Sequence, residues 1–373
     1  MYAFWAWRRI ERLDKRGGMK MVISVKSFVA TLAATVGLVA LGTSIAAAND
    51  IIRIGYGPFL SGGGLFIAQE KGYFSKMGIT VELRRFDDGS LAVPAMIAGE
   101  LDLTNLPAAA NLFNGIAKGA PIAVFADWGN NKPGRAYTAF LVSQKLYDEG
   151  VKTIPDLVKL KGKKVGVGAL GSVNHYNAAQ ALLKAGLNPA KDVQWVVNIP
   201  QPDLMKMLGQ GQLDGSDLSY NLAVFAKNNK MGQIVATGDE IAPNFQIAAF
   251  AGRKDFLTQK HDVMVRFMLA YLQGIKEFDA AAGAPDKDPR ILDILAKYTT
   301  LNKPELIKAI APNWAYLNED GMPQIDSIMA MQDFWSGEYF QYVQKKVTRE
   351  QLFDLSIAKE AKEKFDREKP FGN

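Results

Sequence analysis

The feature that most constrains the fold of this chain is a regular alternation of short apolar strands with helix-like segments. A first stretch predicts strands at 51–56, 80–86, 101–104 and 122–126, with helices at 65–76, 90–98 and 108–118. A second stretch predicts strands at 163–167, 193–197 and 233–237, with helices at 172–185 and 202–210. Such alternation is typical of an α/β fold, in which helices cover a largely parallel sheet.

Two short sequences recur in the same order in both stretches. Met77-Gly78-Ile79 corresponds to Ala185-Gly186-Leu187, and each leads from a helix through a glycine turn. Gly99-Glu100-Leu101-Asp102 corresponds to Gly211-Gln212-Leu213-Asp214, and each closes the following helix. The recurrence of two such sequences in the same order predicts two lobes of similar topology.

Beyond residue 262 the chain is mostly helical, with helices expected at 262–281, 288–299, 303–311, 325–337 and 348–365. We expect this extension to pack on the first lobe, which the chain would re-enter through an extended segment at 246–252. The predicted organisation is a leader at 1–48, a first lobe of 49–143 and 245–373, a second lobe of 144–244, and a hinge near 139–143 and 244–248.

The N-terminal region has the order of a secretory signal from Met19. Lys20 and Lys26 provide the charged part, an apolar run follows at 28–40, and small residues lead to a cleavage site after Ala48. The apolar run is shorter than the roughly 20 residues of a spanning helix. Residues upstream of Met19 fit no signal pattern, so translation is expected to start at Met19 or Met21. We therefore expect a periplasmic protein, without a lipid anchor because no cysteine follows the apolar run.

The formal net charge of +6 comes mostly from this leader. Of the 44 basic and 38 acidic residues, seven basic and two acidic ones lie in residues 1–48, which leaves a net charge of +1 for the rest. A nearly neutral body has no broad positive field to attract a phosphate backbone, so no nucleic-acid partner is expected.

The residue types that most often carry catalysis or metal binding are scarce. The chain has no cysteine and two histidines, His175 and His261, which excludes thiolate sites and argues against a histidine-rich metal site. No Gly-x-Ser-x-Gly elbow and no Gly-Lys-Ser or Gly-Lys-Thr phosphate loop is present. We expect a protein that is not an enzyme and that needs no metal or cofactor.

Several runs of the sequence resemble one family of transport proteins. They are GPF at 57–59, LFIAQEKGYF at 65–74, GITVEL at 78–83, AGELD at 98–102, LKGKKVGV at 160–167, GS at 171–172 with HY at 175–176, and GQLDG at 211–215. These runs are similar to those of solute-binding proteins that serve ABC importers of nitrate, sulfonates, taurine and thiamine-pyrimidine precursors. The likeness spans roughly residues 50–275, and LFIAQEKGYF is its most specific part.

The resemblance implies a two-lobed periplasmic-binding-protein fold, α/β in each lobe, with a hinge between the lobes. The helical C-terminal extension, which the sequence pattern itself predicts, would pack on lobe one. It implies that a small organic solute binds in the inter-lobe cleft and that closure is read by an inner-membrane permease with its ATPase. We expect the protein to be a monomer. The alternative is an enzyme on the same fold, such as one of pyrimidine metabolism.

Candidate ligand contacts in the first lobe lie at predicted strand ends: Phe59, Ser61, Gly62, Gly63, Ser90 and Trp128. Bare glycines before a helix let a ligand approach the backbone, although the same run could be an ordinary turn. Ser90 is either a helix N-cap or a ligand contact. Phe59 and Trp128 could stack on a ligand or simply anchor their loops.

In the second lobe the candidates are Gly171, Ser172, Asn174, His175, Asp217 and Tyr220. Ser172 could cap its helix or donate to a ligand, and the family pattern favours the ligand. His175 could equally pack at the edge of the lobe. Asp217 could pair with a ligand amine or cap the helix that begins near Asn221. Tyr220 could stack on a ring or sit in the core.

Helix N-termini after Gly64, at Ser90 and at Ser172 together suit a small anion such as a sulfonate or carboxylate. Phe59, Trp128 and Tyr220 could hold an apolar or aromatic remainder of the same ligand. Asp217 argues the other way, since a free carboxylate there would favour a zwitterion or an amine-bearing heterocycle.

Overall fold

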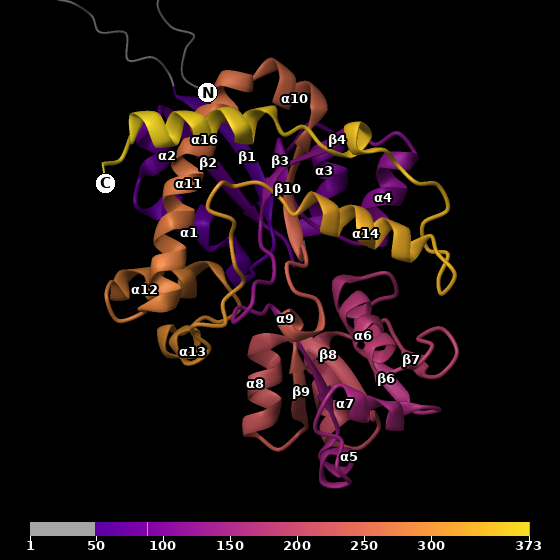
Figure 1. Ribbon diagram of the computed structural model, residues 1–373. Helices are drawn as coiled ribbons and strands as arrows, with labels where there is room; N and C mark the ends of the chain where they lie inside the picture. The colour runs from indigo at the N-terminus through magenta and orange to yellow at the C-terminus, as the bar shows by residue number, and fades with distance from the viewer. Residues whose placement is uncertain (1–48, 88, 373) are drawn as a thin grey trace, which may run out of the picture. The chain divides into compact units, whose positions relative to one another are not determined.

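The computed structural model describes residues 49–87 and 89–372, so the leader expected at 1–48 lies outside the described residues. The described chain contains two five-stranded sheets (Figure 1). The first, ordered β2-β1-β3-β10-β4, contains β1 (Asp50–Tyr56), β2 (Ile79–Arg85), β3 (Leu103–Pro107), β4 (Ile122–Asp127) and β10 (Ala248–Arg253). The second, ordered β7-β6-β8-β5-β9, contains β5 (Thr138–Val142), β6 (Lys164–Gly166), β7 (Gln194–Val196), β8 (Gly215–Ser219) and β9 (Gln233–Thr237).

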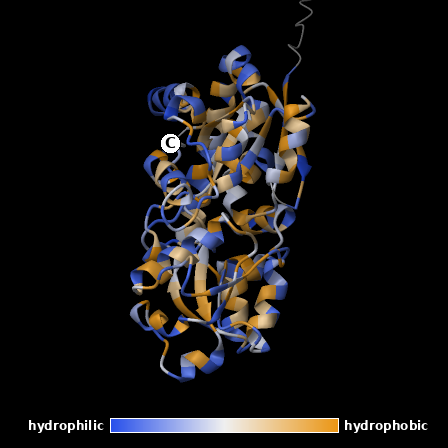
Figure 2. Cartoon of the chain, turned by 90° about the vertical axis from the view of Figure 1, so that its right-hand side faces the viewer, coloured by the Kyte–Doolittle hydropathy of each residue, from blue (hydrophilic) through white to orange (hydrophobic). Residues whose placement is uncertain are grey.

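The two sheets have the same topology, which confirms the prediction made from the sequence echoes. In each, one strand runs antiparallel to both of its neighbours: β10 lies between β3 and β4, and β5 lies between β8 and β9. Each of these strands also carries a register shift midway, between Phe250 and Ala251 and between Phe140 and Leu141. Many strands are coloured as hydrophobic in Figure 2, in keeping with their burial between helices.

The recurring Gly-x-Leu-Asp sequence performs the same structural task in both sheets. Asp102 Oδ2 accepts the N–H of Arg53 at 2.9 Å, and the N–H of Asp102 donates to Arg53 O at 2.8 Å. Asp214 makes the same pair of bonds with Lys164, at 3.0 and 2.9 Å. The carboxylate thus ties the start of one parallel strand to the backbone of its neighbour.

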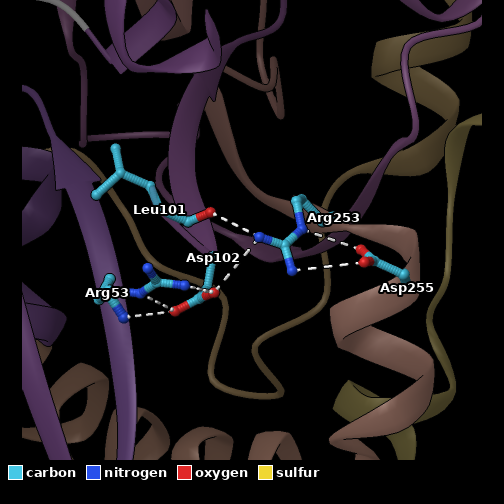
Figure 3. A network of polar contacts seen from close by, with 5 residues as sticks. All are labelled: Arg53, Leu101, Asp102, Arg253 and Asp255. Atoms are coloured by element: carbon cyan, nitrogen blue, oxygen red, sulfur yellow. Dashed lines mark hydrogen bonds and ion pairs between the residues drawn. The ribbon is translucent and has the colours of Figure 1, made fainter. Parts of the chain in front are cut away.

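The two copies differ in burial. The Asp102 side chain is 2% exposed and lies between Arg53 and Arg253 (Figure 3). It accepts from Arg53 Nε at 3.1 Å and Nη2 at 2.8 Å, while Arg253 also donates to Leu101 O and to Asp255. The Asp214 side chain is 33% exposed, and the ammonium of Lys163 lies 4.0 Å from it.

The chain passes between the sheets twice, at 128–137 and at 238–247, and these two connections run side by side. Asn131 N donates to Phe245 O at 2.9 Å, and Ile247 N donates to Gly129 O at 2.9 Å. The sequence predicts that the first part of lobe one ends at residue 143 and that residues 139–143 form one strand of the hinge. β5 instead pairs with β8 and β9, so the first passage occurs earlier than residue 138.

The helices flank the sheets and form the C-terminal extension. Those that follow strands of the first sheet are α1 (Gly63–Glu70), α2 (Tyr73–Lys76), α3 (Val93–Ile97), α4 (Ala110–Ala117) and α10 (Lys254–Gln259). Those of the second sheet are α5 (Gln144–Asp148), α6 (Val173–Lys184), α7 (Gln201–Gly209), α8 (Tyr220–Asn228) and α9 (Gly238–Ile241). The extension contains α11 (His261–Gly283), α12 (Pro289–Tyr298), α13 (Pro304–Ala309), α14 (Ile325–Trp335), α15 (Arg349–Leu352) and α16 (Ser356–Glu368).

The extension packs on the first sheet's side of the molecule, as expected. Helix α11 crosses α1 closely, since a Cβ added at Gly274 would lie 2.0 Å from Gly64 O. Helix α16 in turn packs across α11 (Figure 1). None of the described helices is both long and apolar enough to span a bilayer.

The most specific run of the family resemblance, LFIAQEKGYF, connects α1 and α2 to this extension. Lys71 Nζ pairs with Glu277 of α11 at 2.5 Å and with Asp288 at 3.0 Å. Glu70 accepts from Lys297 at 2.8 Å and from the Tyr298 hydroxyl. The run therefore has a packing role, which explains why it indicates the fold without indicating a ligand.

One sequence prediction differs from the structure in this region. The helix expected at 348–365 is split into α15 and α16, because Phe353 bridges to Val124 of β4 and Asp354 N donates to Val124 O at 2.9 Å. The Ser356 hydroxyl then donates to Asp354 at 2.7 Å, at the start of α16. Pairing with the sheet thus interrupts the helix.

Candidate ligand-binding site

Four turns from strand to helix define the candidate site, two in each lobe. β1 leads through residues 57–62 into α1, and β3 leads into α4; β6 leads through 167–172 into α6, and β8 leads directly into α8. The carboxyl ends of parallel strands are where open α/β sheets bind ligands. The two lobes also touch here, because Ala110 N of α4 donates to Gly171 O at 3.0 Å.

The first-lobe turn holds most of the residues singled out there. Phe59 is half-buried and precedes a 3₁₀ turn at Leu60–Gly62, and Ser61 is buried beside Gly129. A Cβ at Gly62 would lie 2.8 Å from the Trp128 ring, and one at Gly63 would lie 2.1 Å from Phe278. These glycines are thus required by packing, and ligand contact through their amides stays a prediction.

Trp128 follows β4 and is fully buried. Its ring lies edge-on to Phe250, with centroids 4.4 Å apart, and edge-on to Phe66 at 6.5 Å. Its Nε1–H has no hydrogen-bond partner among the described residues. The aromatic ring therefore belongs to the core beneath the 57–62 turn, while its one polar atom is left unpaired.

Ser90 does not begin an α-helix as expected. It lies half-buried in a 3₁₀ turn at Gly89–Ala92, and α3 begins only at Val93, with Ala92 at its N-cap. The turn is held against β3, because Thr104 Oγ1 donates to Gly89 O at 3.0 Å. The N-cap interpretation of Ser90 is therefore wrong, and its contact with a ligand stays a prediction.

Ser172 is the N-cap of α6, and its Oγ accepts from His175 N at 3.2 Å. The structure thus gives Ser172 the capping role, and contact of its half-buried hydroxyl with a ligand stays a prediction. Gly171, just before it, has φ +71°, and a Cβ there would lie 2.9 Å from Ala110 Cβ. A glycine is therefore needed where the second lobe approaches α4.

Asp217 lies within β8 rather than at a helix start, so its expected capping role is wrong; Ser219 is the N-cap of α8. It is fully buried and accepts from Asn174 Nδ2 at 2.8 Å, from Asn177 Nδ2 and from the Thr138 hydroxyl. Burial raises the pKa of Asp217 well above its usual range, and these three donors oppose the rise.

Polar contacts extend from Asp217 toward the next turn. Gln201, the first residue of α7, donates to Asn174 Oδ1 at 3.4 Å and accepts from Ser219 N at 2.8 Å. Tyr220 begins α8, and its hydroxyl accepts from Asn313 Nδ2 of the extension at 2.8 Å. The structure thus brings Ser172, Asn174, Asp217 and Tyr220 into one polar region at the N-termini of α6, α7 and α8.

His175 is fully buried, and burial lowers its pKa to about 3. Its Nδ1 accepts from Gly171 N at 3.0 Å, and its ring lies against four aromatic rings. Of the two interpretations of His175, the structure favours packing at the edge of the lobe.

Several residues of the region were not foreseen, namely Asn105, Thr138, Asn177, Gln201 and Asn313. Asn105 Oδ1 accepts from Gly57 N at 2.9 Å and so fixes the first-lobe turn. Gln201 could have been suspected from its place just before a proline at a helix start. The others carry no signal in the sequence, because isolated amides and hydroxyls are common throughout it.

A second buried carboxylate, Asp127 at the end of β4, joins both connections to the extension. Its oxygens accept from Gly129 N at 2.8 Å, Gln246 Nε2 at 2.7 Å, Asn130 Nδ2 at 3.0 Å and Asn318 N at 2.7 Å. Burial raises the pKa of Asp127 to about 6 while the four donors oppose the rise. No group of three acidic or histidine side chains within the described residues is placed to hold a metal ion.

Residues 46–285 match the family model described as the NMT1-like family, which covers more than half of the chain and includes strands of both sheets. The chain belongs to the NMT1-like family. Its match spans all the strand-to-helix turns described above, and it ends close to the end of α11.

Relatives of this NMT1-like protein include binding proteins. A binding protein of Brucella abortus (strain 2308) is 28% identical over 267 residues, which is 70% of this chain and 76% of the relative. The taurine-binding periplasmic protein of Escherichia coli (strain K12) is 27% identical over 240 residues, which is 62% of this chain and 68% of that protein.

The fold of the NMT1-like protein is also that of solved periplasmic binding proteins. The periplasmic aliphatic sulphonate-binding protein SsuA of Escherichia coli superposes with a TM-score of 0.63 at 19% identity, over 82% of this chain and 92% of SsuA. The predicted two-lobed periplasmic-binding-protein fold is thereby confirmed.

Proposed function

We propose that this protein is the solute-binding component of an ABC-type importer and that it captures a small organic anion with a sulfonate or carboxylate group. The observation that carries the proposal is the NMT1-like match over 46–285, together with the binding proteins among its relatives. The protein would be exported to the periplasm and would deliver its solute to a membrane permease with its ATPase. It would act by binding rather than by catalysis.

The solute would bind between the lobes, at the four strand-to-helix turns. The first lobe would consist of β1–β4, β10 and the extension, and the second of β5–β9. The paired connections at 128–137 and 238–247 would be the hinge, because few other backbone segments would have to bend when the lobes rotate. Arg135 anchors the first connection to the extension, because its guanidinium donates to Trp314 O, Ala315 O and Asp279.

The preference for an anion rests on helix N-termini and on the state of Asp217. The turns into α1 and α6 present backbone N–H groups and the positive ends of two helix dipoles, each worth about 0.3–1 kcal/mol when exposed. Asp217 is occupied by Asn174, Asn177 and Thr138, so it is not free to recruit a ligand amine. Taurine binding by a relative agrees with a sulfonate.

Calorimetric titration tests the proposal. The purified protein is titrated with taurine, butanesulfonate, benzoate, nitrate and a neutral pyrimidine. We expect one-to-one binding of a sulfonate or carboxylate, weakened about five- to tenfold in Ser172→Ala if its hydroxyl or helix start contacts the anion. Binding of the neutral pyrimidine alone would contradict the anion proposal.

Ser143→Ala is the matched control. Ser143 is the N-cap of α5 in the same lobe and accepts from Leu146 N at 3.4 Å, so its loss removes a comparable cap away from the four turns of the candidate site. Both variants should lose about 1 kcal/mol of stability. An equal loss of affinity in both would show that Ser172 acts through stability alone.

A further inference from the structure

His175 lies on the first turn of α6 and makes contacts that reach both lobes. Its Nδ1 accepts from Gly171 N at 3.0 Å, so the neutral imidazole carries its hydrogen on Nε2. Nε2 has no hydrogen-bond partner among the described residues. Complete burial and a pKa lowered to about 3 keep the ring neutral. The Gly171 amide therefore holds His175 in the tautomer that carries its hydrogen on Nε2.

The rings around His175 come mainly from the C-terminal extension. Its centroid lies 5.0 Å from Trp335, 4.9 Å from Phe340 and 5.8 Å from Tyr342, and 4.4 Å from Trp195 of its own lobe. Trp195 and Phe340 are edge-on to the imidazole, which is the arrangement in which an N–H can face an aromatic ring. Three of the four aromatic rings that contact the imidazole thus belong to the extension.

Hydrogen bonds and ring contacts connect His175 through Gly171 and α4 back to Tyr342, which lies against His175 itself. Gly171 N donates to His175, and Gly171 O accepts from Ala110 N at the start of α4. Four residues further along the chain, Asn114 Nδ2 donates to Tyr342 O at 2.7 Å, and Tyr342 lies against His175. There is no room for a side chain at position 171, because a Cβ there would lie 2.9 Å from Ala110 Cβ and 3.6 Å from Tyr342.

We propose that His175 is a positioning residue. By accepting the Gly171 amide while it is seated on Trp335, Phe340 and Tyr342, it fixes the 168–172 turn against α4 and makes solute affinity depend on the C-terminal extension. The proposal rests on the solute site proposed above, because it assigns the 168–172 turn to that site. His175 itself does not contact the solute.

Two substitutions separate positioning from packing. His175→Phe keeps an aromatic ring in the cluster but leaves the Gly171 N–H without its acceptor. It also removes the unpaired Nε2–H, which offsets part of that cost, so stability should fall only slightly. His175→Asn places an acceptor oxygen near the position of Nδ1 but leaves a cavity among the rings, so stability should fall. We therefore expect His175→Phe to be more stable than His175→Asn, whereas the Gly171 amide should be better ordered in His175→Asn than in His175→Phe.

The first measurement needs no ligand. Amide hydrogen exchange at Gly171 should be slow in the wild type, about five- to tenfold faster in His175→Phe, and intermediate in His175→Asn. The ¹⁵N shifts of the wild-type imidazole should report an unprotonated Nδ1. Wild-type exchange at Gly171 in His175→Phe, or exchange that follows the stability ranking, would overturn the proposal.

The second measurement is the affinity for taurine and butanesulfonate. It should fall about five- to tenfold in His175→Phe and less in His175→Asn, despite the lower stability of the latter. A wild-type protein that binds neither compound would count against the sulfonate proposal, while the exchange and ¹⁵N measurements would still decide the role of His175. Equal affinity of wild type and His175→Phe would contradict the role.

Discussion

The two Gly-x-Leu-Asp sequences allow the same substitution to be made twice in one molecule. Asp102 and Asp214 make the same two bonds with the backbone of the neighbouring strand, but they differ in exposure, 2% against 33%. Replacing each by alanine removes the same backbone acceptor. The difference in effect should therefore report the surroundings of the carboxylate.

The structure gives the expected magnitudes. Asp102→Ala leaves Arg53 N without its acceptor inside the sheet, at about 1–3 kcal/mol, and removes charge-assisted bonds worth about 1.5–3 kcal/mol when buried. The second contribution is taken at its lower end because the Arg53 side chain is 40% exposed and water can solvate it. We expect a total loss of about 2.5–4.5 kcal/mol.

Asp214→Ala should cost about 1 kcal/mol, because water can reach Lys164 N and the 4.0 Å contact with Lys163 contributes little. Asp102→Asn keeps one acceptor oxygen for Arg53 N and Nε but replaces the oxygen that accepts from Arg53 Nη2 with a donor, so its loss of stability should lie between those of Asp102→Ala and Asp214→Ala. The assay is the free energy of unfolding from urea titrations followed by far-UV circular dichroism. Equal losses for the two alanine variants, or a loss below about 1 kcal/mol for Asp102→Ala, would refute the reasoning.

Three further predictions concern other parts of the molecule. Burial raises the pKa of Asp127 to about 6. The stability that the protonated carboxyl contributes is therefore complete below pH 3.8, the ordinary pKa of the group, and is lost as the pH rises through 6. Between pH 4 and 6 the wild type should lose about 2 kcal/mol relative to Asp127→Asn, measured by urea unfolding across that range, and parallel profiles would contradict the raised pKa of Asp127. Gly274→Ala should destabilise by about 2–3 kcal/mol because its Cβ would meet Gly64 O, whereas Gly115→Ala in α4, where a Cβ meets nothing within 4 Å, should be neutral or slightly stabilising; thermal unfolding compares them. Mass spectrometry of the exported protein should find a mature N-terminus near Asn49, and an intact leader on soluble cytoplasmic protein would contradict export.

Periodicity predicted the fold well where apolar residues alternate with turns. The strands at the start of each lobe and the helices α11 to α14 of the extension lie within a few residues of their expected bounds, since both follow from burial of one face. β8 was missed because Gly-Ser-Asp-Leu-Ser has low strand propensity, yet all five residues are buried in the centre of the second sheet. Tertiary pairing overrides local preference there.

Long-range partners also explain the errors in boundaries. The apolar sequence of Thr138–Val142 predicts a strand but not the sheet that it joins, and β8 and β9 decide this. The same holds for the break before α16, which depends on Val124, more than 200 residues away.

The candidate site was predictable as a set of loops but not as a set of roles. Glycines and serines at strand ends marked the turns, since those turns need short side chains and caps. The sequence could not show that His175 meets Trp335 and Tyr342, or that Asp217 meets Thr138, because each pair joins residues far apart in the chain. Packing and hydrogen-bond roles were therefore distinguished from ligand contact only by the structure.

Small-angle X-ray scattering of the purified protein, titrated with the panel of sulfonates, carboxylates, nitrate and neutral pyrimidine, tests the central claim most directly. Capture of a solute between two lobes predicts that at least one anion of the panel lowers the radius of gyration in a saturable way, at the concentrations where calorimetry detects binding. A compound that binds to saturation and leaves the scattering curve unchanged would contradict capture between the lobes, and a panel without any binding anion would contradict the proposed solute class.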